Sequence, residues 1–114
     1  MCIRGDIYKV NLGNNEGSSI QGGCRPVVVV SNNKNNTFSN VVTVIPLTSK
    51  IKKTTLPTHV TICGYGLSKV SQAQAEQIRQ IDKRILTDRN YIGHIEDETI
   101  MDNLIAAVIC QISN

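Results

Sequence analysis

The feature that most constrains the fold of this chain is a short continuous apolar run, Val27–Val30, preceded by Arg25 and Pro26. A run of this length fits a central strand of a sheet. Proline is tolerated at the start of such a strand, where its missing N–H does least harm. Val and Ile dominate an apolar content of 40%, and β-branched residues favour strands. We therefore expect β-structure over the first two-thirds of the chain.

Further strands are predicted on either side of this run. Residues 6–12 alternate, with Tyr8, Val10 and Leu12 on one face. We predict two more strands, at residues 41–47 and 58–62. The connections are a Gly-, Asn- and Ser-rich loop (13–23), an Asn-rich hairpin loop (31–40), a lysine-bearing segment (49–56) and a turn (64–66).

Residues 70–81 are ambiguous on their own. Their Ala, Gln and Glu content favours a helix, whereas the alternation of Val70, Gln72, Gln74 and Glu76 with their neighbours suits a strand.

The last segment, residues 97–112, is predicted to be a helix. Asp97 is its expected N-cap, and Glu98 suits the positive end of the helix dipole. The expected apolar stripe consists of Ile100, Met101, Leu104, Ile105, Val108, Ile109 and Ile112.

Length and composition narrow the class of protein. The 114 residues fit one domain, 1–114, and a net charge of +3 permits a nucleic-acid partner without requiring one. The N-terminus has no apolar signal region, so we expect a cytoplasmic protein. The four cysteines, Cys2, Cys24, Cys63 and Cys110, are widely spaced. We expect them to be reduced, small buried hydrophobic residues rather than metal ligands.

Three segments carry a family resemblance: residues 4–8 (RGDIY), 21–29 (QGGCRPVVV) and 76–84 (EQIRQIDKR). They resemble the patterns R-G-D-[IV]-[YW], Q-G-G-x-R-P-V-[LV]-V and E-Q-I-R-[ST]-[IV]-D-[KR]-x-R of the MazF/PemK toxins. Residues 44–49 (VIPLTS) and 56–60 (LPTHV) follow in the family's order. The likeness covers nearly the whole chain. Ala75 departs from it, because a bulkier apolar residue is usual there.

The resemblance implies a small Src-homology-3-like β-barrel with a C-terminal helix, in which residues 70–81 form a strand. It also implies a homodimer that cleaves single-stranded RNA without a metal or other cofactor. The expected products are 2′,3′-cyclic phosphate and 5′-hydroxyl ends, and relatives of the E-Q-I-R-x-I-D type prefer sites containing ACA. A cognate antitoxin with an acidic, flexible tail is the expected protein partner.

Arg25 and Thr48 are the predicted catalytic residues. RNA carries its own nucleophile, the 2′-hydroxyl, so an enzyme need only orient it and stabilise the charge that develops at phosphorus. The planar guanidinium of Arg25 fits phosphate oxygens. Electrostatic stabilisation is its first expected role and proton donation to the leaving group its second. The hydroxyl of Thr48 could hold a phosphate oxygen or the 2′-hydroxyl.

Other residues are expected to bind the RNA. Gly22 and Gly23 can present backbone N–H groups to a phosphate, and amide, hydroxyl and carboxylate groups can hydrogen-bond unstacked bases. The predicted RNA-binding set is Ser18, Ser19, Gln21, Gly22, Gly23, Glu76, Gln77, Lys50, Lys52 and Lys53. A plain turn and a solvated lysine loop are the alternatives. His59 and His94 are expected to be structural.

Two other functions remain open from the sequence. The same barrel family includes toxins that poison gyrase, so the fold alone does not decide the activity. A non-catalytic RNA-binding barrel is the other alternative. The presence of both Arg25 and Thr48 favours the nuclease.

Overall fold

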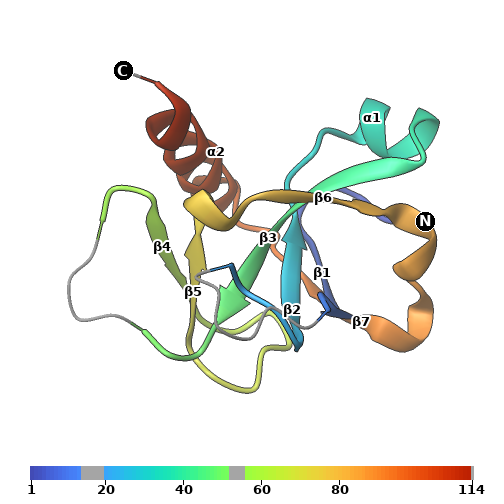
Figure 1. Cartoon of the computed structure of the whole chain (residues 1–114), viewed down its shortest axis with the longest axis horizontal. Helices are drawn as coiled ribbons and strands as arrows, with labels where there is room; N and C mark the ends of the chain where they lie inside the picture. Colours follow the sequence, from blue (N-terminus) through green and yellow to red (C-terminus); the bar gives the residue numbers. More distant parts are fainter. Residues whose placement is uncertain (14–19, 52–55, 114) are drawn as a thin grey trace.

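The first three valines of the run, Val27–Val29, lie in strand β2 (Cys24–Val29), which has an antiparallel neighbour on each side. The computed structural model describes residues 1–13, 20–51 and 56–113. The sheet has the order β4-β5-β3-β2-β1-β7, and β6 pairs with β3 off this path (Figure 1). The other strands are β1 (Asp6–Asn11), β3 (Val41–Thr48), β4 (His59–Ile62), β5 (Ser71–Gln74), β6 (Arg79–Asp82) and β7 (Tyr91–His94). The predicted central strand, and the strands predicted near β1, β3 and β4, are confirmed.

Both faces of β2 are buried, which explains its unbroken run of valines. Val28 and Val30 join one core, which also contains Ile45 and Leu47 of β3. Val27 and Val29 join the other, with Tyr8, Val10 and Leu12, the predicted apolar face of β1. Because successive strand residues point to opposite sides, one short run supplies two cores.

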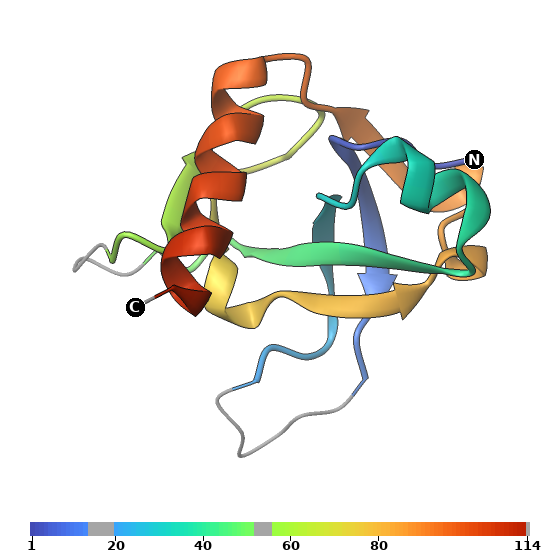
Figure 2. The ribbon, with the colours of Figure 1, turned by 90° about the horizontal axis from the view of Figure 1, so that it is seen from above.

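The C-terminal helix α2 (Glu98–Ile112) closes the first core. Asp97 caps it as predicted, accepting a hydrogen bond of 2.9 Å from the N–H of Thr99. The helix lies along one side of the strands (Figure 2). Met101 and Leu104 are fully buried, but Ile109 and Ile112 are 54% and 72% exposed. The predicted apolar stripe is therefore buried over most of its length but exposed in the last turn of the helix.

Three expectations about secondary structure are corrected. Residues 31–40 are not only a loop, because helix α1 (Asn33–Phe38) forms there, capped by Asn32. Residues 70–81 are neither one helix nor one strand. A 3-10 helix, η1 (Ala75–Gln77), separates β5 from β6 and lets β3 pair with both strands. Strand β7 was not predicted; it is short and contains Gly93.

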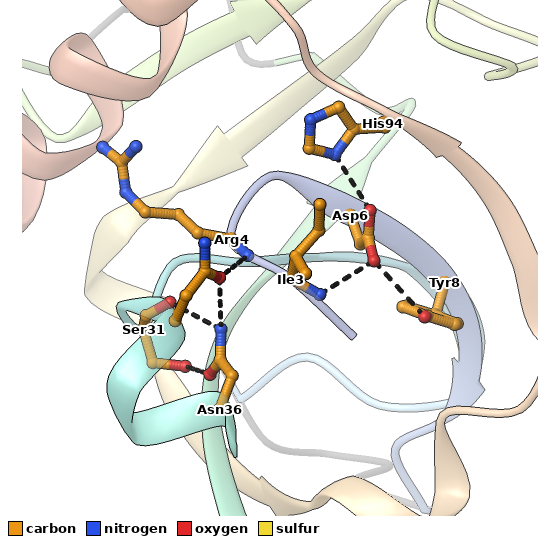
Figure 3. Close-up of polar contacts among 8 residues, drawn as sticks. Ile3, Arg4, Asp6, Tyr8, Ser31, Asn36 and His94 are labelled. Carbon is orange, nitrogen blue, oxygen red and sulfur yellow. Dashed lines mark hydrogen bonds and ion pairs between the residues drawn. The ribbon is translucent and has the colours of Figure 1, made fainter. Parts of the chain in front are cut away.

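The Arg4-Gly5-Asp6 segment is structural. The buried carboxylate of Asp6 accepts a hydrogen bond from the N–H of Ile3 and contacts His94 Nδ1, both at 2.9 Å (Figure 3). The hydroxyl of Tyr8 donates to the same carboxylate at 3.4 Å. Burial, followed by the charge of Asp6, raises the pKa of Tyr8 well above its ordinary value. These contacts join the N-terminus to β7 and confirm His94 as structural.

The cysteines differ from the expectation. Cys2 is buried, and burial raises the pKa of its thiol. Cys24, Cys63 and Cys110 are exposed and free, so only Cys2 behaves as a small core residue. No helix within the described residues is long and apolar enough to cross a bilayer.

The turn at residues 64–66 rests directly on the backbone of β7. A Cβ atom added to Gly93 would lie 1.9 Å from the carbonyl oxygen of Tyr65, and one added to Gly66 would lie 2.3 Å from that of Ile92. Neither contact is possible for a real side chain. Glycine at both positions therefore lets the two main chains touch.

Gly93→Ala should lower the free energy of unfolding by about 3 kcal/mol or more, because the turn and β7 must separate. Gly64→Ala is the control: nothing lies within 4 Å of its added Cβ, so only its left-handed backbone should cost about 1–2 kcal/mol. Urea unfolding measures both. If both variants lost the same free energy of unfolding, the close approach of the turn to β7 would be contradicted.

Candidate functional site

The register of the sheet brings Arg25 and Thr48 into one row across three strands. The antiparallel β2–β3 ladder ends at this side with the pair Val27–Pro46. Arg25 lies two residues before Val27 and Thr48 two residues after Pro46, so alternation puts both on the same face at this end of the strands. Thr48 pairs on its other side with Gln72 of β5. Directly opposed residues share a face of a sheet. Arg25, Thr48 and Gln72 thus form what we call the cross-strand row.

Arg25 is held by the loop that precedes it. Its Nε donates a 2.8 Å hydrogen bond to the carbonyl oxygen of Gly22. Its side chain is half-buried, and no other hydrogen bond to the guanidinium is present among the described residues. The terminal nitrogens therefore keep donors for a ligand.

A cleft of about 650 Å³ opens at this end of the sheet. Arg25 and Thr48 line it together with Lys9, Lys50 and Lys69. The hydroxyl oxygen of Thr48 accepts a 3.1 Å hydrogen bond from the N–H of Lys50, which fixes the chain as it leaves β3. Four cations around one cleft suit an anionic ligand such as a phosphodiester chain.

The predicted base-binding residues Gln21 and Gln77 contact each other. The backbone N–H of Gln21 donates to Gln77 Oε1 at 3.0 Å, and Gln21 Nε2 donates to Gln74 Oε1 at 3.1 Å. These bonds place the segment before Arg25 against β5 and η1. Gln77 lies in the 3-10 helix η1 and not in a strand.

Glu76 is paired with a buried histidine. His59 Nε2 lies 2.9 Å from Glu76 Oε2, and the His59 side chain is 1% exposed. The N–H of Leu56 donates to His59 Nδ1 at 3.4 Å, which assigns the proton of a neutral ring to Nε2. Partial burial opposes ionisation of Glu76, but hydrogen bonds from His59, the backbone and Thr58 outweigh it and lower the pKa of Glu76.

The structure thus gathers some predicted site residues and separates others. Arg25, Thr48 and Lys50 share the cleft. Gln21 and Gly22 lie on the segment that holds Arg25, and Gln77 contacts this segment from η1. Gly23 is exposed beside them, and Glu76 is engaged with His59. Ser18, Ser19, Lys52 and Lys53 lie outside the described residues.

Sequence reasoning missed four residues of this region. Lys9 and Lys69 line the cleft, but isolated lysines carry no signal in a sequence. Gln72 and Gln74 are buried. The only sign of them in the sequence was that two amides occupy alternate positions of a possible strand, where apolar residues would be expected to pack.

A family model described as the PemK-like, MazF-like toxin of type II toxin-antitoxin systems matches residues 3–112. The chain is 46% identical over 103 residues to "Endoribonuclease EndoA" of Bacillus subtilis (strain 168), covering 89% of this chain and 85% of that protein.

Solved structures agree in fold. A mycobacterial endoribonuclease in complex with its cognate antitoxin superposes with a TM-score of 0.76 at 26% identity, covering 97% of this chain and 94% of that one. MazF from Deinococcus radiodurans gives a TM-score of 0.75 at 22% identity, covering 96% and 94%. The expected mainly β fold with a C-terminal helix is confirmed.

Glu76→Gln should destabilise the protein at neutral pH by less than about 1 kcal/mol, the range of partly exposed pairs. Because the folded pKa of Glu76 lies below its unfolded value, its stabilisation is present above the unfolded pKa. It is lost as the pH falls through the folded pKa. The stability difference between the variant and the wild type should therefore vanish in acid. Chemical unfolding from neutral to acidic pH tests this, with exposed Glu96→Gln as control. A difference that persists in acid would refute it.

Proposed function

The chain belongs to the PemK-like, MazF-like toxins of type II toxin-antitoxin systems, and we propose that it is an endoribonuclease that cuts single-stranded RNA. The observation that carries this proposal is Arg25, held by Gly22 in the same cross-strand row as Thr48, at a cleft lined with lysines. The Bacillus relative named an endoribonuclease supports it.

The reaction is an internal transesterification. The 2′-oxygen forms a bond to phosphorus as its proton passes to water. The bond from phosphorus to the 5′-oxygen breaks, and the 5′-oxygen takes up a proton from water or from Arg25. The products are a 2′,3′-cyclic phosphate and a 5′-hydroxyl. Arg25 stabilises the charge on the phosphorane through its terminal nitrogens, and Thr48 holds a phosphate oxygen or the nucleophile. Since the nucleophile belongs to the substrate and the charge is met by Arg25, the step needs no metal.

The lysines of the cleft bind the phosphates on either side of the scissile one. Lys9, Lys50 and Lys69 supply charge without sequence preference. Sequence preference, which we propose includes ACA, comes from amide groups such as Gln21 and Gln77, which can hydrogen-bond unstacked bases.

We further propose that the protein acts as a homodimer restrained by a cognate antitoxin with an acidic, flexible tail. The mycobacterial structure described as an endoribonuclease with its cognate antitoxin supports the second part. An acidic peptide is attracted by the same lysines as RNA. It therefore competes with RNA for the cleft.

The purified protein should cleave single-stranded RNA in excess EDTA and leave 5′-hydroxyl ends. An oligonucleotide with a single 2′-deoxy sugar at the cleavage site should stay intact, because it lacks the nucleophile. End-group analysis of the fragments checks both statements. Loss of cleavage on chelation would exclude the metal-free mechanism, and cleavage of the deoxy substrate would exclude the 2′-hydroxyl as nucleophile.

Arg25→Ala should lower kcat by about 100-fold or more, because an aligned charge donor to the transition state is lost. Its melting temperature should change little, since Arg25 lies at the edge of the core. Thr48→Ala should reduce kcat less. Exposed Arg89→Ala removes the same charge elsewhere and serves as control. Unchanged turnover in Arg25→Ala would show that the site is misassigned.

A further inference from the structure

Strand β5 carries two glutamines where a buried strand ordinarily carries apolar residues. Gln72 is 0% and Gln74 is 4% exposed. Their neighbour Ala73 belongs to the apolar core, so the two amides lie on the opposite face of β5. That face is the one on which Gln72 opposes Thr48 in the cross-strand row.

The two amides are linked in series to the segment before Arg25. Gln74 Nε2 donates to Gln72 Oε1 at 2.9 Å, and Gln21 Nε2 donates to Gln74 Oε1 at 3.1 Å. The next residue, Gly22, accepts the 2.8 Å bond from Arg25 Nε. Gln72, Gln74 and Gln21, which we call the glutamine network, thus connect β5 to the guanidinium.

The glutamine network is not what stability alone would select. Gln72 Nε2 is buried and has no hydrogen-bond partner within the described part of the chain. A buried amide donor without a partner is destabilising, and replacing a buried hydrogen-bonded pair with apolar groups of similar shape is nearly neutral or stabilising. A buried polar group of this kind requires an explanation, and service to a site is one that native proteins use.

We propose that Gln74, anchored by Gln72, is a positioning residue that sets the orientation of Arg25 through Gln21 and the carbonyl of Gly22. This inference rests on the proposed RNA cleavage. Gln74 donates one bond to Gln72 of its own strand and accepts the other from Gln21, so it ties the segment that holds Arg25 to β5.

The expected consequence is a loss in turnover and not in binding. Without the Gln74 acceptor, the segment loses the bond from the Gln21 side chain to β5. The Gln21–Gln77 contact and the backbone bonds of Gly23 to Leu12 and Gly13 remain, so the segment stays folded while Gly22 is less well placed. The charge of Arg25 remains, so RNA is still attracted. Its alignment with the reacting phosphorus becomes less favourable, which affects the transition state more than the ground state.

The test uses Gln74→Met, which keeps the length of the side chain and removes both hydrogen bonds. We expect kcat to fall about tenfold while KM changes much less. The melting temperature should not fall in parallel. Exposed Gln80→Met on β6 is the matched control and should behave as wild type. Wild-type kcat in Gln74→Met would overturn the proposal.

The double variant Gln72→Leu/Gln74→Met distinguishes a loss of positioning from a loss of stability. It removes the unpartnered amide together with its neighbour, so its melting temperature should equal or exceed that of wild type while kcat stays low. A purely structural role predicts the reverse, a lower melting temperature with activity lost only on unfolding. That outcome would refute positioning.

A measurement independent of activity separates this inference from the proposed function. Solvent exchange of the Arg25 Nε proton, followed by NMR on labelled protein, should be slow in wild type and Gln80→Met and faster in Gln74→Met. If the wild type fails to cleave RNA, the proposed function fails, whereas this exchange still reports on the network. Equal exchange in all three proteins would overturn the positioning role.

Discussion

The pairing of β2 with β3 is the interaction on which the rest of the structure depends. Both strands are apolar on both faces, so each contributes to two cores at once. A slip of one residue in their register would exchange the two faces along the whole ladder. The same alternation, continued past Val27 and Pro46, puts Arg25 and Thr48 on one face at the end of the two strands, and both residues line the cleft. The packing that stabilises the fold therefore also aligns the candidate site.

Some of this was predictable from local pattern. The run Val27–Val30, the alternation in β1 and the cap at Asp97 each satisfy a physical rule within a few residues. Helix α1 was missed because its Asn-rich sequence has low helix propensity. It forms through the Asn32 cap and the buried Asn36, which exchanges hydrogen bonds with Ser31 (Figure 3). Local side-chain hydrogen bonds of this kind leave no periodic signal.

The candidate site, too, could be predicted from the sequence only in part. Arg25 and Thr48 were identified by resemblance, and their neighbourhood in space follows from the strand register. Gln72 and Gln74 could not be assigned from the sequence, since alternating amides suit an exposed strand as well as a buried one. Their burial depends on Gln21, far away in the chain, which supplies a partner. The exposed cysteines were mistaken for core residues because burial statistics describe a residue type and not its position.

The contact between the turn at residues 64–66 and β7 also limits which substitutions this part of the chain can accept. At Gly66 and Gly93 an added side chain would meet main-chain atoms. No exchange of a neighbouring side chain can create room, because every amino acid carries the same carbonyl. A compensating substitution in a neighbouring residue therefore cannot accommodate a larger residue at either position. The contact therefore requires glycine at both positions, whereas the backbone contact sets no such requirement on the side chains that flank them.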